Sequence, residues 1–267
     1  MIGRLQDRVA IITGAGSVGP GWGNGKATAV RFAEEGSKIF ATDINPEAAA
    51  ETKKLITDAG GTCVTHTADI TKTEDVKALV GACMDEFGRI DILHNNVGGS
   101  MPGGPADMPE DVWQGQIDHN LTHIYLMCRY VLPIMEEQGK GVIINMSSTS
   151  GIRYSGHPHT AYAATKAAII QFSRSVAIQY AKKGIRCNSI LPGLMHTPMV
   201  EARLAGHRAG GDVDKIVADR NAAIPMGWAG DGRDTANAAL FLASDEARFI
   251  TATEIIVDGG RSAASPY

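Results

Sequence analysis

Short apolar runs alternate with helical patterns along almost the whole chain, and this alternation restricts the fold more than any other feature of the sequence. The runs have the length of buried strands, and the segments between them carry apolar residues at helical spacing. Strands that alternate with helices in this way pair in parallel through right-handed crossovers. The predicted strands are Val9–Thr13, Lys38–Thr42, Thr62–His66, Ile90–His94, Val142–Met146, Arg186–Leu191 and Glu254–Val257. The sequence therefore predicts an α/β fold with a doubly wound, Rossmann-like parallel sheet of about seven strands.

The predicted helices occupy the connections between these strands. Asn45 is placed to cap a helix that begins at Pro46 and ends near Gly60. The other predicted helices are Lys26–Glu35, Glu74–Phe87, a long pattern that ends near Met135, Ala161–Lys182 and Asp234–Leu242. No linker or change of composition divides the chain, so we expect a single domain over residues 1–267. Residues 195–225 break the alternation, and we expect them to form a small helical lid over a substrate.

Composition argues against several classes of partner. The 267 residues carry a formal net charge of −4 and the sequence pI is about 6.1, which offers no basic surface for nucleic acid or an anionic membrane. No apolar run is long enough to span a bilayer, and the segment Met1–Asp7 lacks the apolar stretch of a secretory signal. The cysteines are far apart and form no CxxC pair. We therefore expect a cytoplasmic protein with reduced thiols rather than a disulfide or zinc framework.

A glycine-rich stretch connects the first predicted strand to the first helix. It begins at Gly14 and ends in Gly23-Asn24-Gly25. Glycines let the backbone adopt positive φ angles and approach a ligand closely, and a helix N-terminus attracts phosphate. A flexible turn has a similar composition, but the strand–loop–helix context favours a dinucleotide-binding site.

Asp43 follows the second predicted strand and bears on the choice of dinucleotide. A carboxylate at this point accepts hydrogen bonds from the adenosine ribose hydroxyls, and it would repel the 2′-phosphate of NADP(H). NAD(H) is therefore favoured as the cofactor. Lys26 lies near the loop and can soften this preference, and the alternative role of Asp43 is that of a turn or N-cap residue.

Two further strand ends fall at the same edge of the predicted sheet. Asp69 and Ile70 follow the third strand, where they can meet the adenine. Asn95 and Val97 belong to a small-residue turn after the fourth strand, where the backbone can approach the ribose. Each turn alone is ordinary loop chemistry, but together they extend the dinucleotide site.

Tyr162 and Lys166 are four residues apart and so lie on one face of the helix after the fifth strand. Removing a hydride from an alcohol also requires a base for the hydroxyl proton. Free tyrosine, with a pKa near 10, is a poor base at neutral pH. A neighbouring ammonium and an oxidised nicotinamide both favour the phenolate, so we expect them to lower the pKa of Tyr162 toward neutrality. The alternative is a half-buried tyrosine beside a solvated lysine.

Two more polar positions belong to this predicted site. Ser147 and Ser148 end the fifth strand, where a hydroxyl can hold the substrate oxygen against the tyrosine. Asn120 lies inside the long helical pattern before that strand, and asparagine is a mediocre helix former. We expect Asn120 either to interrupt the helix and hold a proton-relaying water or to be simply structural.

Taken together, these stretches resemble the short-chain dehydrogenase/reductase family over nearly the whole chain. The resemblance also includes Pro192-Gly193, Thr197-Pro198 and the ending Val257-Asp258-Gly259-Gly260. It implies a catalytic tetrad and a nicotinamide amide held by Thr197 and the Met195 backbone, with Pro192 beside them. The implied tetrad is Asn120, Ser148, Tyr162 and Lys166. Members of the family are commonly homotetramers that pack the helices around Asn120–Met135 and Ala161–Lys182 against their copies.

The sequence departs from the family pattern in three places. Gly23 follows Gly14 by nine residues, where the family usually has four, so which glycines contact phosphate stays open. Val97 stands where the family usually has alanine. Ser148 precedes Tyr162 by fourteen residues, one more than is typical, which makes Thr149 a rival for its role.

Several other side chains have both a functional and a structural interpretation. Between Ser148 and Tyr162 the chain offers Arg153, Tyr154, His157 and His159, which either recognise a polar or acidic substrate or belong to a surface loop. In the predicted lid, a carboxylate clamp or a solvated helix face would be formed by Arg203, His207 and Arg208. His119 and His123 have a metal-binding spacing, but no carboxylate accompanies them at metal spacing, so we expect no metal.

The sequence thus predicts an oxidoreductase that transfers a hydride between NAD(H) and a secondary alcohol or ketone. Two alternatives stay open. An NADPH-linked ketoreductase has Asp43 against it. A non-catalytic dinucleotide-sensing module would have no need of the residues that position a base.

Overall fold

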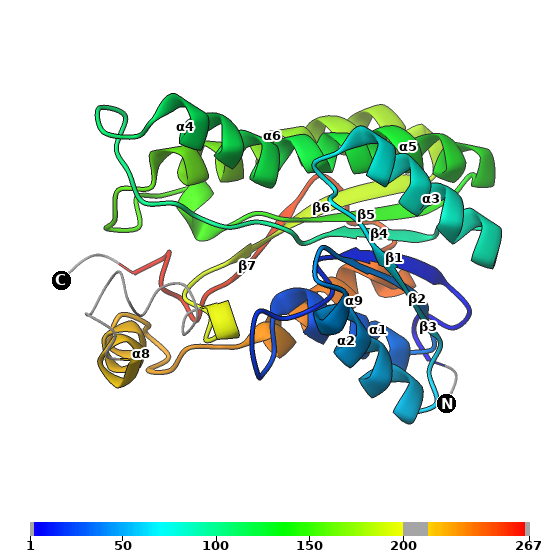
Figure 1. The fold of residues 1–267 in the computed structure, drawn as a ribbon, viewed down its shortest axis with the longest axis horizontal. Coiled ribbons are helices and arrows are strands. Elements are labelled where there is room, and N and C mark those ends of the chain that lie inside the picture. The colour runs from blue at the N-terminus through cyan, green and yellow to red at the C-terminus, as the bar shows by residue number, and fades with distance from the viewer. Residues whose placement is uncertain (1–2, 200–212, 265–267) are drawn as a thin grey trace.

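The computed structural model describes residues 3–199 and 213–264. Within these residues, seven strands form one sheet in the order β3-β2-β1-β4-β5-β6-β7, and each neighbouring pair is parallel (Figure 1). The strands are β1 (Val9–Thr13), β2 (Lys38–Asp43), β3 (Cys63–Thr67), β4 (Ile92–Asn95), β5 (Gly141–Met146), β6 (Ile185–Pro192) and β7 (Glu254–Val257). The predicted doubly wound parallel sheet is confirmed.

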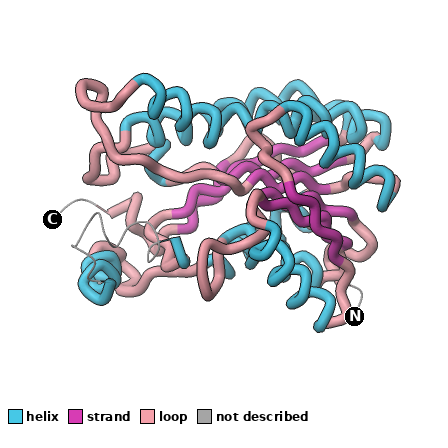
Figure 2. The backbone as a smooth tube through the Cα atoms, in the orientation of Figure 1, coloured by secondary structure: helices cyan, strands magenta, loops and turns pink. Residues whose placement is uncertain are grey.

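Helices cover both faces of the sheet, as Figures 1 and 2 show. One face is covered by α3 (Thr73–Phe87), α5 (His123–Gln138) and α6 (Thr160–Tyr180). The other face is covered by α1 (Asn24–Glu34), α2 (Pro46–Asp58) and α9 (Gly232–Ala243). Two shorter helices, α4 (Glu110–Ile117) and α8 (Val213–Ala222), lie at the left of Figure 1.

Strand β1 shows why the strands read as continuous apolar runs. All five of its residues are buried. Val9 and Ile11 belong to the core cluster under α3, α5 and α6, whereas Ala10 and Ile12 belong to the cluster under α1 and α9. Successive side chains in a strand point to opposite faces, so a sheet that is covered on both faces requires apolar residues at every position.

The helix boundaries follow local sequence signals. The Asn45 side chain accepts hydrogen bonds from the backbone N–H groups of Glu47 and Ala48, which confirms the predicted cap of α2. Strand β4 begins at Ile92 rather than Ile90 and extends through Asn95. This shift places Asn95 inside the strand instead of in the turn after it.

The long helical pattern before β5 is interrupted in the structure. Between α4 and α5, residues Asp118–Thr122 form a π-helical turn that contains Asn120. Such turns insert an extra residue into a helix and are frequent at functional sites. The predicted interruption at Asn120 is therefore confirmed.

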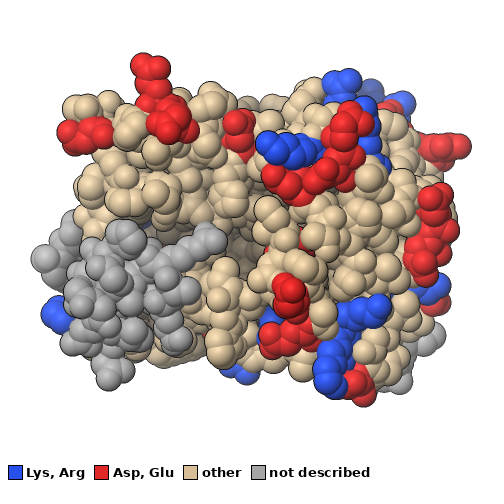
Figure 3. All heavy atoms as spheres, in the orientation of Figure 1, with Lys and Arg blue, Asp and Glu red and all other residues tan. Residues whose placement is uncertain are grey.

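The predicted lid over residues 195–225 falls partly outside the described residues, which end at 199 and resume at 213. Its described part includes α8. Across residues 3–199 and 213–264, no helix combines the length and the apolar character needed to cross a membrane. On the face drawn in Figure 3, acidic and basic side chains are mixed rather than gathered into one large basic patch.

Two histidines are wholly buried in the core. His94, on β4, has neither ring nitrogen hydrogen-bonded, and its ring lies 6.4 Å from that of Phe32. His123, on α5, contacts the Val97 carbonyl through Nε2. Burial lowers the pKa of each imidazole to about 3, because the charged form would lose its hydration. Both histidines are therefore neutral in the folded protein at neutral pH.

Replacing His94 with Leu is expected to reduce the acid sensitivity of the fold. Below pH 6.5 the unfolded chain protonates this imidazole, whereas the buried ring stays neutral until its lowered pKa of about 3. The free energy of unfolding therefore falls with falling pH, by about 1.4 kcal/mol per pH unit for each such histidine. Urea unfolding of His94→Leu between about pH 7 and about pH 5 should show a shallower fall than the parent protein.

The neighbouring change Phe32→Leu is the control for this experiment. It should lower stability at every pH, because it leaves a cavity, without changing the slope against pH. A slope that stays the same in His94→Leu would contradict the assignment of His94 as a buried neutral imidazole.

Candidate active site

A cavity of about 740 Å³ lies at the carboxyl ends of the strands. The strand order reverses at β1, because β2 and β3 lie on one side of it and β4 to β7 on the other. The loops after β1 and β4 therefore leave in opposite directions and open a crevice, which is where sheets of this kind bind ligands. Residues that follow each of the strands from β1 to β6 line the cavity.

The glycine loop between β1 and α1 brings two stretches of backbone into close contact. A Cβ atom on Gly25 would lie 1.9 Å from the Gly14 carbonyl oxygen, and one on Gly14 would lie 2.9 Å from a Val97 methyl group. Gly14 also has a φ of 61°, which glycine adopts without strain. Only glycine fits at these two positions. With Gly16, Gly23 and Asn24, these residues form the floor of the cavity.

The additional residues of this loop extend toward the segment after β6. The Ser17 hydroxyl donates to the Gly19 carbonyl at 2.8 Å, and a Cβ on Gly21 would lie 3.3 Å from Pro198 Cγ. Trp22 lies between the charged ends of Lys26 and Arg233. The cavity-lining glycines of the loop are Gly14, Gly16, Gly23 and Gly25, whereas Gly19 and Gly21 are not among the lining residues.

Asp43 lies at the cavity as predicted. Its carboxylate accepts a hydrogen bond from the Gly16 N–H and another from the Asn45 N–H, both at 2.9 Å. The carboxylate is thus fixed at the end of β2, against the glycine loop. Lys26 does not lie beside it at the cavity: its ammonium pairs with Glu51 at 2.5 Å and its side chain is 5% exposed. The expectation that Lys26 softens the effect of Asp43 therefore has no support in this geometry.

Of the residues predicted at the ends of β3 and β4, three line the cavity and one does not. Asp69, Ile70 and Val97 line the cavity. Burial alone would raise the pKa of Asp69, but hydrogen bonds from the hydroxyl and N–H of Thr71, together with the charges of Lys72 and His119, lower it below the ordinary value. The Asn95 side chain points away from the cavity and donates to Asn145 Oδ1 at 2.8 Å inside the sheet.

Asn96 lies at the cavity in place of Asn95. Its side chain donates to the Gly14 carbonyl at 3.1 Å and so connects the loops after β1 and β4. The sequence prediction missed Asn96 because it ended the strand at His94. Since successive side chains alternate between faces, an error of one residue in the strand end exchanges which asparagine faces the ligand.

Asn120 does not line the cavity, but it fixes a loop that does. Its side-chain amide accepts from the Gly99 N–H and donates to the Gly99 carbonyl, each at 3.0 Å. It also donates to the Gln116 carbonyl at 3.0 Å, inside the preceding helix. A Cβ on Gly98 would lie 2.9 Å from both Asn120 Oδ1 and Lys166 Nζ, so this loop passes closely between the two side chains.

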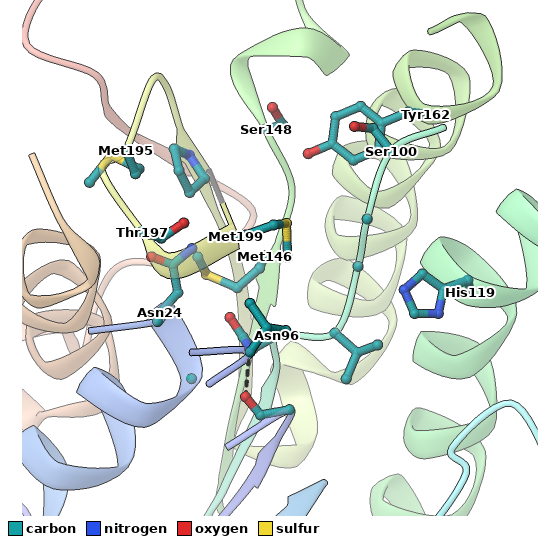
Figure 4. A pocket seen from close by; sticks show the side chains of 18 of the residues that line it. Asn24, Asn96, Ser100, His119, Met146, Ser148, Tyr162, Met195, Thr197 and Met199 are labelled. Atoms are coloured by element: carbon teal, nitrogen blue, oxygen red, sulfur yellow. Dashed lines mark hydrogen bonds between the residues drawn. The ribbon is translucent and has the colours of Figure 1, made fainter. Parts of the chain in front are cut away.

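Tyr162 and Ser148 lie across the cavity from Asn24 of the glycine loop (Figure 4), and Lys166 lines the same cavity. Figure 4 shows the Tyr162 hydroxyl directed toward the side where Ser148 lies. The Lys166 ammonium lies 5.6 Å from the centre of the Tyr162 ring and donates to the Met146 carbonyl at 2.8 Å. The Ser147 hydroxyl instead donates to the Lys166 carbonyl at 2.7 Å. Of the two serines, Ser148 is therefore the one that faces the tyrosine.

The ionisation of this pair differs from the sequence prediction. Burial raises the pKa of Tyr162, and the hydrogen bond with Ser148 only partly opposes this. Burial also lowers the pKa of the Lys166 ammonium to about 7. The loss of hydration disfavours both charges, so the lysine alone does not bring Tyr162 toward neutrality in this structure.

The segment after β6 completes the cavity. Pro192, Met195 and Thr197 line it as predicted, and Figure 4 shows Met195 and Thr197 across the cavity from Tyr162. Thr149, the rival of Ser148, is buried and lies with its hydroxyl 3.4 Å from the Pro192 carbonyl, which it contacts instead of the tyrosine.

The other side chains singled out in the sequence have different locations in the structure. Arg153 does not act as an open anion site, because its guanidinium donates to the carbonyls of Arg261 and Ser262. His119 lines the cavity while His123 is buried. No group of metal-binding side chains occurs among the described residues, and nothing in the geometry of His119 and His123 forms one. The predicted lid cations Arg203, His207 and Arg208 lie outside the described residues.

The structure also adds residues that the sequence prediction missed. Besides Asn96, the cavity is lined by Ser100, Arg220 and Arg261. Ser100 belongs to the loop after β4, Arg220 to α8 and Arg261 to the C-terminal segment. No motif surrounds them, and only the folding of three distant segments onto one cavity brings them together.

Comparison with known proteins agrees with this arrangement. The family model described as Enoyl-(Acyl carrier protein) reductase matches residues 20–262. The chain is 37% identical to the 2,5-dichloro-2,5-cyclohexadiene-1,4-diol dehydrogenase of Sphingobium indicum, over 98% of this chain and 99% of the relative. It is 38% identical to 3beta-hydroxysteroid dehydrogenase 1 of Eggerthella lenta, over 96% of this chain and 94% of the relative.

A solved structure is similar over the whole fold. It is that of a candidate short-chain dehydrogenase/reductase from Burkholderia xenovorans, which is 53% identical, with a TM-score of 0.95 over 99% of this chain and all of that one. The chain belongs to the short-chain dehydrogenase/reductase family, as its sequence motifs predicted. It is an oxidoreductase of this family, whose members generally bind a nicotinamide dinucleotide.

Proposed function

We propose that this protein transfers a hydride between NAD(H) and a secondary alcohol or ketone, with Tyr162 as the general acid–base. The observation that carries the proposal is the Tyr162 hydroxyl, which hydrogen-bonds with Ser148 in the same cavity as the glycine loop. A protein that only binds a dinucleotide has no use for such a pair, so this arrangement disfavours a non-catalytic sensing module.

The volume of the cavity and its glycine lining support the binding of a dinucleotide. The volume of about 740 Å³ lies in the usual range for ligand sites, and the glycine floor leaves no side chain where a pyrophosphate would approach the start of α1. We propose that the cofactor is held by Gly14, Gly23, Asn24, Gly25, Asp43, Asp69, Ile70, Val97, Pro192, Met195, Thr197, Tyr162 and Lys166. Asn95 supports the site only from inside the sheet, through its bond to Asn145.

NAD(H) is favoured over NADP(H) by the charge at the end of β2. Both Asp43 oxygens accept backbone N–H groups, which hold the carboxylate in place at the cavity. A 2′-phosphate there would meet a negative charge, and Lys26, the cation that the sequence places near the loop, is already paired with Glu51. This electrostatic conflict is also the reason for preferring the present proposal to an NADPH-linked ketoreductase.

The nicotinamide, when bound, supplies the hydride acceptor or donor. For oxidation of an alcohol, Ser148 holds the substrate oxygen while the Tyr162 oxygen takes the hydroxyl proton. In the reverse direction Tyr162 returns that proton to the carbonyl oxygen. A positive charge close to the tyrosine is needed to offset the effect of burial on its pKa, and Lys166 together with the oxidised nicotinamide supplies it.

Lys166 and Asn120 have supporting roles in this proposal. The Lys166 ammonium is fixed by the Met146 carbonyl and can also donate to the nicotinamide ribose. The Asn120 amide is fully engaged with Gly99 and Gln116, so it acts by positioning the loop beside Lys166 rather than by touching the substrate.

We further propose a homotetrameric, cytoplasmic, single-domain enzyme in which residues 195–225 cover the substrate. The surface of α5 and α6 supports self-association, because it exposes Tyr125 and Ile178 at 46% and 69%. A largely apolar recess on this surface is lined by Leu121, Thr122, Tyr125, Ala168 and Phe172. All four cysteines are buried and free, as suits a reducing compartment.

Replacing Tyr162 with Phe is expected to abolish turnover while leaving cofactor binding nearly unchanged. The ring and its packing against His159 are retained, and only the proton-transferring oxygen is lost. Loss of a general base typically lowers kcat about 100- to 10,000-fold. Initial rates with a panel of secondary alcohols and fluorescence titration with NADH measure the two effects. Tyr180→Phe, at the other end of the same helix, is the control, and activity retained in Tyr162→Phe would refute the proposed base.

The pH at which Tyr162 forms its phenolate is expected to depend on the cofactor. Burial disfavours the phenolate, so without NAD⁺ it should form only above the ordinary tyrosine range. A bound positive charge favours the phenolate, so NAD⁺ should lower that pH and alcohol oxidation should accelerate from neutral to mildly alkaline pH. The difference in ultraviolet absorbance between the parent protein and Tyr162→Phe isolates this titration. A flat rate profile, with chemistry shown to be rate-limiting, would contradict the mechanism.

Removing the charge of Asp43 is expected to relax the choice of cofactor. Asp43→Asn keeps an oxygen that can accept from the Gly16 N–H, whereas Asp43→Ala removes it. In both variants the ratio of kcat/KM for NAD⁺ to that for NADP⁺ should fall by about tenfold or more, because one charge–charge repulsion is lost. Asp58→Ala removes the same charge at the end of α2 and serves as the control. An unchanged ratio in both Asp43 variants would remove the reason for assigning NAD(H).

A further inference from the structure

Two arginines from segments far apart in the sequence line the cavity that holds Tyr162. Arg220 belongs to α8, and Arg261 follows the paired glycines Gly259 and Gly260 near the end of the chain. Neither is part of a motif, and the proposed hydride transfer uses neither. Their shared location indicates a function in recognising the substrate.

The segments that carry these arginines pack against each other. The Met226 N–H donates to the Gly259 carbonyl at 3.3 Å. A Cβ on Gly259 would lie 2.6 Å from a methyl group of Ile224, which follows α8 directly. The C-terminal segment therefore packs on the turn that follows α8, so the two arginines are carried by segments that contact each other.

Polar contacts fix the backbone beneath Arg261. The Asp258 carboxylate accepts from the N–H groups of Gly260 and Ser262 at 2.9 and 2.6 Å. The Arg153 guanidinium donates to the carbonyls of Arg261 and Ser262. Arg153 thus holds this backbone in place, and among residues 3–199 and 213–264 the Arg261 guanidinium has no hydrogen-bond or ion-pair partner.

Arg220 is held beside the Met195 backbone. Its Nη2 donates to the Met195 carbonyl at 2.9 Å, and the guanidinium is partly buried. The nearby carboxylate that lines the cavity is Asp219, which pairs with Lys215 at 2.8 Å on the exposed side of α8. His157 and His159 line the same cavity. Arg220 and Arg261 thus bring two guanidinium groups to the cavity lining, although the whole chain has a net charge of −4.

We infer that the substrate of this site is a secondary alcohol or ketone with an anionic group, a carboxylate or a sulfonate, which Arg261 and Arg220 bind. The inference rests on the proposed function and names its substrate class. Guanidinium groups in partly desolvated sites bind such oxyanions through charge-assisted, often bidentate, hydrogen bonds. The open guanidinium of Arg261 supplies this contact, and Arg220 supplies positive charge beside Met195.

The first experiment compares matched alcohols with and without the charge. The probes are 3-hydroxybutanoate, 4-hydroxypentanoate and 5-hydroxyhexanoate, their methyl esters, and the sulfonate analogue of each chain length. For at least one chain length, kcat/KM should be about 10- to 100-fold higher for the anion than for the ester. Comparison of carboxylate with sulfonate shows which oxyanion the site prefers. Esters that are oxidised as well as all of the anions would overturn the inference.

The second part of the experiment assigns the effect to Arg261. In Arg261→Gln the advantage of the anion over the ester should disappear, mainly through a higher KM for the anion, and kcat/KM should fall much more for the anion than for the ester. Arg248→Gln is the matched control, because it removes the same charge from an exposed position outside the cavity. An anion preference that survives in Arg261→Gln would also overturn the inference.

A binding measurement separates this inference from the proposed reaction. The Tyr162→Phe variant, loaded with NAD⁺, is titrated calorimetrically with the same anions and esters, so that no turnover is required. Tighter binding of an anion, lost on adding Arg261→Gln, supports the inference even if the parent protein oxidises none of the probes. Equal binding of anions and esters overturns it, whatever the result of the activity assay.

Discussion

The reversal of strand order at β1 is the constraint on which the rest of the molecule depends. Because β2 and β4 lie on opposite sides of β1, the loops that follow β1 and β4 separate at the carboxyl edge and cannot cover it. Residues that follow each of the strands from β1 to β6 then line one crevice. The Gly14–Asn96 contact fixes the two separating loops to each other, and the start of α1 points its free N–H groups into the space between them.

Burial has opposite consequences in different parts of this fold. In the core, burial keeps His94 and His123 uncharged. The free energy of unfolding therefore falls with falling pH, and neither histidine takes part in the proposed reaction. At the cavity, burial disfavours charge on both Tyr162 and Lys166. A base that ionises with difficulty alone, and more readily beside a bound cation, would become reactive only when the oxidised cofactor is present. Desolvation thus lowers stability at acidic pH through the core histidines, whereas at Tyr162 it supports the proposed mechanism.

The two ends of the cavity differ in the elements that build them. The proposed cofactor end is made by turns that directly follow β1, β2 and β3, and its chemistry is that of backbone N–H groups and the Asp43 carboxylate. The proposed substrate end is made by α8 and the C-terminal segment, which are not strand ends of the central crevice. Residues on such segments can change without disturbing the sheet, and this is where the family resemblance says least about the substrate.

Local pattern determined most of this protein from the sequence alone. Apolar runs fixed the strands, Asn45 fixed the start of α2, and the strand–loop–helix context identified Gly14 and Gly25, because each of these effects acts over a few residues. Other features depended on contacts between distant segments and needed the tertiary structure. The choice of Asn96 over Asn95 followed from where β4 ends, and the raised pKa of Tyr162 followed from burial. The presence of both Arg220 and Arg261 at one cavity followed from the packing of the chain end on the turn after α8. Spacing in the sequence does not determine these features, because the loss of hydration and the contacts between distant segments arise only when the chain is packed.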